Sequence, residues 1–404
     1  MAPQRRRTRA RPRVLLPLAL LLAGGCASVP TAYEAPPALA PAERPAHNLQ
    51  VFDRAWGLVR DHYFDRTFGG RDWPALRTRY RPAAEQAPDD AALYAVLTRL
   101  LAELPDSHLV ALPPRSAHEL RTQHRAAVGM RWRVVEDRRV VTEIVPGSPA
   151  AAAGVQVGWM PVARDGVPLD EETPFTNEVG RRVTYTFLDA ADQPVELTMT
   201  ATLLSFERRE ARRLDGGALF LRFDSFSGTN LRWLSAQLKA HRDAPAVIVD
   251  LRQNPGGLAV ALRLAVGEFF DRPVATGTIV RRNGRESGWD SLLLFSARYP
   301  GRVAILLDRF SASSAEIFAH VLRHHGRATL VGRPTAGAVV VARFYPLPGG
   351  GRLEVPVEDF VGLDGRRLEG RGVAPDVPVE LTLADLRAGR DPDLAAALRA
   401  VQAP

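Results

Sequence analysis

Two segments of this chain place groups that could attack or stabilise a carbonyl at the start of a helix. Residues 250–257 (DLRQNPGG) follow an apolar run, and their paired glycines would let backbone N–H groups approach a ligand closely, as an oxyanion hole requires. Residues 308–318 (DRFSASSAEIF) also follow an apolar run and hold three serines within four positions. Each segment alone has a simpler interpretation, because Gly-Gly also makes a tight turn and serine often caps a helix.

The runs around these segments predict that a mostly parallel α/β sheet positions them. Between residues 212 and 402, continuous apolar strands alternate with helices, a pattern typical of a sheet covered on both faces. Both chemical segments would then lie where a buried strand meets a helix. The expected strands are 218–223, 246–250, 303–307 and 329–331, and the expected helices are 231–241, 258–270 and 315–323.

Two further parts are expected before this α/β core. Residues 46–116 carry apolar side chains at 3.6-residue spacing, which predicts a small helical domain. Pro105 would end the last of its long helices, before a loop that carries His108. Residues 125–206 change to short β runs separated by turns rich in Gly, Ser and Pro, which predicts a β-rich domain.

The amino-terminal residues have the three parts of an export signal. Residues 1–13 contain six arginines and no acid, so removing them reduces the net charge from +8 to +8 − 6 = +2. No basic stripe with interleaved aromatic residues then remains for a nucleic acid to contact. An apolar run over 14–22, too short to span a membrane, leads to small residues and to the only cysteine, Cys26.

This leader, residues 1–26, resembles a bacterial lipoprotein signal, in which the cysteine becomes the lipidated first residue. We therefore expect Cys26 to carry a lipid anchor, and the alternative is a plain secretory signal with a chance cysteine. Residues 27–45, rich in Pro and Ala, predict a disordered tether. The expected location is the cell envelope of a Gram-negative-type bacterium, on the periplasmic side.

Residues 250–257 and 308–318 indicate a function when they are considered together. The Gly-Gly run, the serine run that follows it and residues 332–337 (GRPTAG) resemble the C-terminal processing (tail-specific) protease family. The resemblance covers most of the mature chain and extends to residues 372–376 (GVAPD) and 389–392 (GRDP). It implies an α/β core of the ClpP/crotonase-like kind, with a serine nucleophile.

Roles in catalysis can be carried over from this resemblance by motif. The nucleophile would be Ser313, the middle serine of its run. The oxyanion hole would use the N–H of Ser314 and the N–H of a glycine in the turn, Gly256 or Gly257.

The base is where the sequence departs from the best-known branch of the family. That branch uses a Ser/Lys dyad, but Ala338 stands at the lysine position, and the only lysine, Lys239, lies in a helix before residues 250–257. A hydroxyl nucleophile still needs a base with a pKa near the working pH, which points to histidine. His108 is the expected base, because residues 104–108 (LPDSH) resemble the corresponding loop of the branch that includes the tricorn core protease.

That branch uses serine, histidine and glutamate, assisted by a serine beside the histidine. The set carried over by motif is Ser313, His108, Ser107 and Glu369. By the logic of a triad, the histidine takes the proton and the acid fixes its tautomer. Other histidines are weaker choices, either as backup bases (His118, His124) or as packing and surface residues (His320, His324, His325).

Part of the β-rich domain resembles a PDZ domain, which binds an extended peptide at a sheet edge and captures its carboxylate with backbone N–H groups. The resemblance rests on residues 147–154 (GSPAAAAG) and on the strands around them. The carboxylate-binding loop would contain Val128, Gly129 and Met130. Trp159 departs from the pattern, since protease-associated PDZ domains usually carry Asp there.

The sequence therefore predicts a multi-domain α/β serine endopeptidase that cuts peptides or unfolded protein tails. No His, Cys, Asp and Glu cluster has metal-ligand spacing, so we expect no metal and no cofactor. A non-catalytic, PDZ-bearing scaffold is one alternative, and the loss of the lysine favours it. A crotonase-like acyl-group enzyme is the other, but the export signal and the PDZ-like segment argue against it.

Overall fold

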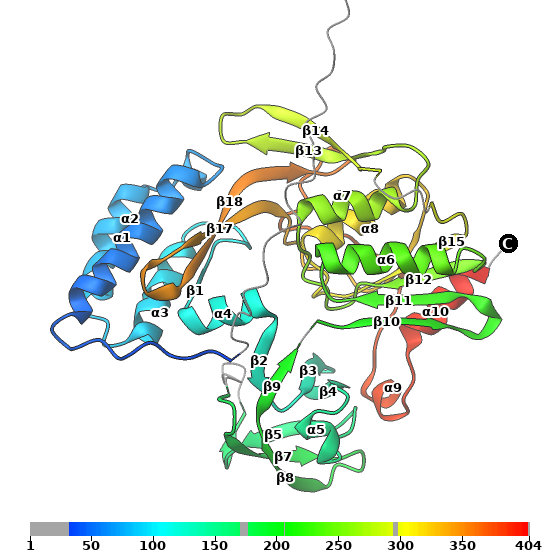
Figure 1. Cartoon of the computed structure of the whole chain (residues 1–404), viewed down its shortest axis with the longest axis horizontal. Helices are drawn as coiled ribbons and strands as arrows, with labels where there is room; N and C mark the ends of the chain where they lie inside the picture. Colours follow the sequence, from blue (N-terminus) through cyan, green and yellow to red (C-terminus); the bar gives the residue numbers. More distant parts are fainter. Residues whose placement is uncertain (1–31, 170–176, 206, 294–297, 403–404) are drawn as a thin grey trace, which may run out of the picture.

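Figure 1 shows the computed structural model of the chain, which describes residues 32–169, 177–205, 207–293 and 298–402. The leader with Cys26 and the first residues of the expected tether lie outside the described residues. Helices gather on one side of the molecule, an α/β part lies on the other, and a β-rich part lies below both (Figure 1). This mixed architecture confirms the predicted fold class.

The sheet of the α/β part is six-stranded, in the order β10-β11-β12-β15-β16-β19. Its neighbouring strands are parallel except for β10 with β11. The two central strands are apolar and buried along almost their whole length, as expected for a sheet covered on both faces. The bounds are β10 (Arg209–Arg213), β11 (Leu219–Phe223), β12 (Ala246–Asp250), β15 (Arg302–Leu307), β16 (Thr329–Gly332) and β19 (Val377–Pro378).

Helices cover both faces of this sheet (Figure 1). Three of them pack on one face in a cluster that includes Leu234, Leu262 and Phe318, and α10 packs on the other through Ala397. Because β12 and β15 are adjacent and parallel, the two segments that follow them meet at one edge of the sheet. The bounds are α6 (Gly228–Ala240), α7 (Ala259–Gly267), α8 (Ser314–His324) and α10 (Pro392–Gln402).

A second sheet, which the sequence analysis did not predict, lies beside the first (Figure 1). Its order is β1-β18-β13-β14, and β17 pairs with β18. β1 comes from the expected helical domain, yet it pairs antiparallel with β18 from the carboxyl-terminal half of the chain. The bounds are β1 (Val110–Leu112), β13 (Ala275–Arg281), β14 (Glu286–Asp290), β17 (Val340–Pro346) and β18 (Arg352–Val361).

The amino-terminal helices begin at clear signals. Asp72 and Asp89 cap α2 and α3 by accepting backbone N–H groups of their first turns. The helices do not close their own core, because Leu353 and Val355 of β18 are fully buried in the same cluster. No helix in the described ranges is long and apolar enough to cross a membrane. The bounds are α1 (Arg44–His62), α2 (Trp73–Glu85), α3 (Asp90–Leu101) and α4 (Pro114–Thr122).

The β-rich part leaves and re-enters the rest of the molecule through the paired strands β2 and β9. It contains the β3–β4 hairpin, the short helix α5 and a sheet in the order β6-β5-β7-β8. Trp159 packs against the ring of Phe187 inside its small core. The bounds are β2 (His124–Ala127), β3 (Met130–Val135), β4 (Arg138–Ile144), α5 (Pro149–Ala152), β5 (Met160–Arg164), β6 (Val167–Pro168), β7 (Arg182–Leu188), β8 (Pro194–Thr200) and β9 (Thr202–Ser205).

Several contacts hold the β-rich part against the core, among them those of the short helix α9 (Leu383–Arg387) and of Asp308. This helix packs its leucines in a cluster with Met160. Arg133 of β3 forms an ion pair with Asp308, a fully buried carboxylate at the end of β15. Because Asp308 opens the serine segment, the position of the β-rich part is tied directly to the chemical edge of the sheet.

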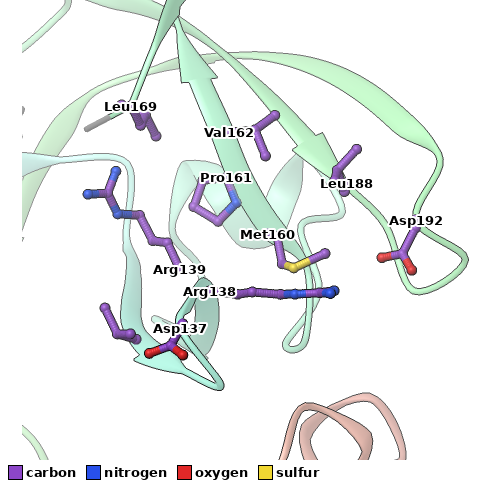
Figure 2. Close-up of a pocket in the computed structure, with 10 residues that line it drawn as sticks. Asp137, Arg138, Arg139, Met160, Pro161, Val162, Leu169, Leu188 and Asp192 are labelled. Carbon is purple, nitrogen blue, oxygen red and sulfur yellow. The ribbon is translucent and has the colours of Figure 1, made fainter. Parts of the chain in front are cut away.

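The β-rich part also carries a cavity of its own, of about 630 Å³ (Figure 2). Asp137, Arg138, Arg139 and Asp192 surround the apolar side chain of Met160 there. Among the described residues, its lining contains no serine, cysteine or histidine. This cavity therefore offers no nucleophile of the kind that the sequence predicts.

An arginine network fastens the carboxyl-terminal helix to the glycine segment. The Arg252 guanidinium lies 2.7 Å from Asp250, 2.9 Å from Asp391 and 3.0 Å from Asp393. Asp250 and Asp393 are almost completely buried, so their charges depend on these partners. Arg333 supplies Asp393 with a second ion pair at 2.6 Å.

Replacing Arg252 by Met should lower the free energy of unfolding by about 3–5 kcal/mol, because buried carboxylates would lose their partner. Urea unfolding followed by circular dichroism measures this change. The matched control is Arg232→Met on the exposed face of α6, which should change stability by less than about 0.5 kcal/mol. Equal effects of the two substitutions would show that the network does not hold the fold.

Candidate active site

Ser313 occupies a strained turn between β15 and α8. Its backbone has φ 54° and ψ −118°, a conformation that costs a non-glycine residue about 1–3 kcal/mol. Two acceptors hold it there, since its N–H points to the carbonyl oxygen of Ala338 at 2.8 Å and to Oε2 of Glu316 at 3.0 Å. The Ser313 side chain lines a large cavity, where a substrate could reach its hydroxyl.

The glycine turn lies directly against this serine. A Cβ at Gly256 would stand 2.7 Å from Cβ of Ser313 and 2.8 Å from the nitrogen of Ser314, so only glycine fits. The N–H of Gly256 is already bonded to Oδ1 of Asn254 at 2.9 Å. Within the described chain, no partner is found for the N–H of Gly257 or of Ser314. These two groups are the ones left to bind an oxyanion.

The His108 loop makes a hydrogen-bonded chain with Glu369. Nδ1 of His108 lies 2.8 Å from the hydroxyl oxygen of Ser107, and that hydroxyl lies 3.1 Å from Oε2 of Glu369. The N–H of Ser107 donates to Oε1 of Glu369 at 2.8 Å, and the N–H of Val339 donates to Oε2 at 2.6 Å. Residues that lie 262 positions apart in the chain are thus joined.

This chain of hydrogen bonds selects one tautomer of the histidine. An ionised carboxylate only accepts hydrogen bonds, so the Ser107 hydroxyl donates to Glu369 and accepts from Nδ1–H of His108. Nε2 of His108 then carries the free lone pair that a general base needs. Burial lowers the pKa of His108 below its ordinary value, and the negative charge of Glu369 partly offsets this effect.

One cavity of about 1360 Å³ brings the expected site residues together. Its walls come from the helical part, the β-rich part and the α/β core. The site residues expected from the sequence that line it are Ser107, His108, Val128, Gly129, Met130, Gly256, Gly257, Ser313 and Ser314. Glu369 reaches it through the hydroxyl of Ser107.

The position of the only lysine agrees with the absence of a Ser/Lys dyad. Lys239 is exposed in the last turn of α6 and does not line the cavity. Ala338 does line it, and its carbonyl oxygen accepts the hydrogen bond from Ser313 N–H. At this position the chain therefore offers backbone and a methyl group to the cavity, and no basic side chain.

The other histidines have contacts of a structural kind. His320 is buried, and its Nε2 accepts the N–H of Leu363 at 3.0 Å. Burial lowers the pKa of His320 to about 4. His124 lines the cavity, but its Nδ1 faces the carbonyl oxygen of Thr122 at 2.7 Å. No group of three or more His, Cys, Asp or Glu within the described ranges is arranged to hold a metal ion.

Sequence reasoning missed the part played by Glu316, which it treated only as a motif residue. This buried carboxylate accepts the hydroxyl of Thr335 at 2.5 Å and the N–H groups of Gly337 and Ala338 at 2.9 Å each, besides that of Ser313 at 3.0 Å. Burial raises the pKa of Glu316, and these hydrogen bonds oppose the rise. The sequence did contain a signal for this role. Glu316 stands three residues after Ser313, and an acid at that position can accept the backbone N–H at the start of the helix.

The site and fold can now be compared with known proteins. Residues 218–379 match peptidase family S41, and residues 44–102 match the C1 domain of tricorn protease. A carboxyl-terminal-processing protease of Synechocystis sp. is 28% identical over 371 residues, covering 85% of this chain and 84% of that protein. The putative tricorn protease homolog 2 of Streptomyces coelicolor is 26% identical over 388 residues, covering 87% of this chain but 32% of that protein.

Solved structures show the same fold. The photosystem II D1 C-terminal processing protease superposes with a TM-score of 0.59 at 21% identity, covering 88% of this chain and 97% of that one. Tricorn protease superposes with a TM-score of 0.53 at 18% identity, covering 88% of this chain and 36% of that one. Mature CPAF, in its complex with lactacystin, superposes with a TM-score of 0.62 at 14% identity, covering 89% of this chain and 98% of that one.

These similarities define the protein as a serine peptidase, which confirms the prediction of an enzyme. More narrowly, residues 218–379 of its α/β core match the model of peptidase family S41. Neither the non-catalytic scaffold nor the crotonase-like enzyme is favoured by them.

Glu316→Gln should lower kcat at least tenfold while changing KM little, because an amide nitrogen would face backbone N–H groups and release the strained turn at Ser313. Steady-state cleavage of an unstructured fluorogenic peptide measures both constants. Glu380→Gln, at an exposed position, is the matched control and should leave them unchanged. A Glu316→Gln enzyme with normal kcat would show that the carboxylate does not position the serine.

Proposed function

We propose that this peptidase is an endopeptidase in which Ser313 attacks the peptide carbonyl and His108 acts as the general base. The observation that carries the proposal is the Glu369–Ser107–His108 chain of hydrogen bonds, which opens on the cavity that Ser313 lines. It supplies a histidine with the required tautomer to a serine that has no lysine beside it.

The proposed reaction follows from the free groups at the site. His108 Nε2 takes the proton of the Ser313 hydroxyl as its oxygen bonds to the carbonyl carbon. The N–H groups of Ser314 and Gly257 stabilise the oxyanion that forms. The imidazolium then gives its proton to the leaving amine, and a water molecule, deprotonated by His108, hydrolyses the acyl-enzyme. Glu369 stabilises the imidazolium through Ser107.

The proposed substrate is the carboxyl-terminal tail of an unfolded protein or peptide. The printed names of relatives such as the Synechocystis carboxyl-terminal-processing protease support this substrate. So does the arrangement of the β-rich part, which we propose to be a PDZ-like domain. Val128, Gly129 and Met130 line the same cavity as Ser313, so a tail bound there would lead into the site.

The backbone at this proposed carboxylate loop is specific to glycine. Gly129 has φ 88°, and a Cβ on it would stand 2.1 Å from Cβ of Ser148. The neighbouring carbonyl oxygen, that of Val128, accepts the N–H of Ala150 at 2.8 Å, which ties the loop to α5. Backbone N–H groups held in this way suit the capture of a carboxylate.

We further propose that the enzyme works in the cell envelope, anchored by a lipid on Cys26 and facing the periplasm. This part of the proposal rests on the sequence of the leader, with its arginines, short apolar run and small residues before the cysteine. Mass spectrometry of the mature chain tests it, since a lipidated Cys26 should be the first residue.

The test of the chemistry is labelling by a fluorophosphonate probe, which reacts with activated serines. Wild-type protein should be labelled, and Ser313→Ala should abolish the label because the reacting oxygen is lost. His108→Ala should slow labelling by at least a hundredfold through loss of the base. Ser311→Ala is an unsuitable control because its hydroxyl is buried and bonded to Leu251, so Ser287→Ala on β14, which does not line the cavity, serves instead. Full labelling of Ser313→Ala would contradict the assignment.

The dependence of kcat/KM on pH tests the base. Only neutral His108 can accept a proton, and burial lowers its pKa, so activity should rise with pH along a limb centred below 6.5 and then level off. Glu369→Gln removes the negative charge that raises this pKa. The variant should therefore show a limb shifted to lower pH together with a plateau reduced by at least tenfold. A limb that moves to higher pH would contradict the proposed arrangement.

A further inference from the structure

Part of the cavity that Ser313 lines carries acidic and apolar side chains that binding of a neutral peptide backbone would not need. α4 presents Ser116, Glu119 and Leu120 to the cavity, at the spacing of a single helical face, and its C-cap residue Gln123 lies beside them. The opposing lining residues come from the second sheet, including Leu112, Val340, Ala342, Phe344 and Glu354. None of these named lining residues is a site residue expected from the sequence.

Glu354 enters the cavity because of the alternation of β18. Its neighbours Leu353 and Val355 are fully buried in the core of the helical part. Successive side chains of a strand point to opposite faces, so Glu354 points away from that core. It lines the cavity, beside Phe344 of β17, with which it is paired in register.

The charge of Glu354 is not satisfied within the described chain. No hydrogen bond or ion pair to its carboxylate is found among the described residues. Arg352 is the charged neighbour that acts on it, but the Arg352 guanidinium stacks on the Phe344 ring at 4.6 Å. Burial raises the pKa of Glu354 to about 7, and Arg352 opposes the rise.

Two other acids on the same cavity have more than one arginine acting on them. Asp224 lies 3.4 Å from the guanidinium of Arg131. Arg125 and Arg115 act electrostatically on Glu119. Glu354 is thus a partly buried carboxylate, among apolar neighbours, on which a single arginine acts without an ion pair. A substrate side chain with a positive end and an apolar stem could pair with this carboxylate and pack against its apolar neighbours.

Strand β17 connects Glu354 to the nucleophile. It starts two residues after Ala338, whose carbonyl oxygen holds Ser313, and Phe344 lies 344 − 338 = 6 residues along the chain. Six residues of strand span roughly 20 Å. Among the described strands, β17 pairs only with β18, which leaves its other edge free to bind an extended substrate.

We propose that Glu354 binds a lysine or arginine side chain of the substrate, about four to six residues from the cleaved bond. The proposal rests on the peptidase function set out above and adds a selectivity to it. The aliphatic stem of the basic residue packs against Leu112 and Phe344, and its charged end meets the Glu354 carboxylate.

A position scan tests this selectivity. Peptides of one neutral, unstructured sequence carry a single lysine, moved one position at a time on both sides of the cleaved bond, and norleucine replaces it in the reference. Wild-type enzyme should cleave one lysine peptide, with the lysine about four to six residues from the bond, with a kcat/KM at least tenfold above that of its norleucine partner. Glu354→Gln should reduce that ratio to near one, whereas Glu354→Asp should keep part of it.

Glu286→Gln, at an exposed position of β14, is the matched control and should keep the wild-type ratio. A wild-type ratio near one at every position overturns the inference without reference to any variant, and so does a ratio that persists in Glu354→Gln. Cleavage of the norleucine peptides and labelling of Ser313 in the same samples separate this failure from failure of the proposed function. In that second case neither would be observed.

Discussion

The hydrogen bonds of the buried Glu316 carboxylate are the contacts on which the proposed chemistry of this molecule depends. Its oxygens accept the N–H of Ser313 from the start of α8 and three donors from residues 335–338. Without these bonds, the strained serine would be held by its N–H bond to Ala338 and by the two bonds that its carbonyl oxygen accepts from Glu316 and Ile317. The same turn continues to Val339, whose N–H binds Glu369, so one stretch of backbone aligns the proposed nucleophile and the proposed acid.

Much of this arrangement could be predicted from the sequence, because it depends on local patterns. The apolar runs placed β12, β15 and α8 within one or two residues of their observed bounds, and the serine and glycine segments followed from them. The second sheet could not be predicted in the same way. Its strand β14 is polar and alternates little, and the pairing of Val110 with Glu354 joins segments with no shared local signal.

The choice of base shows the same limit. Lysine could be excluded by counting, because the chain has only Lys239. The selection of His108 as the base needed the resemblance to a known family, because the residues around it in the sequence do not indicate a contact with Glu369. The discrimination between Gly256 and Gly257 was also out of reach, because it depends on where the side chain of Asn254 points.

The core that the amino-terminal helices share with strand β18 has a consequence for the time at which the chain can become active during its synthesis. Leu353 and Val355 complete the packing around α1–α3, and Glu369 lies further along still. A chain still being synthesised therefore has neither a finished helical part nor an acid for the proposed histidine until residues 353–369 have been made. Under the proposed mechanism a copy that stops before these residues would be inactive, so the peptidase could not act before its own fold was complete.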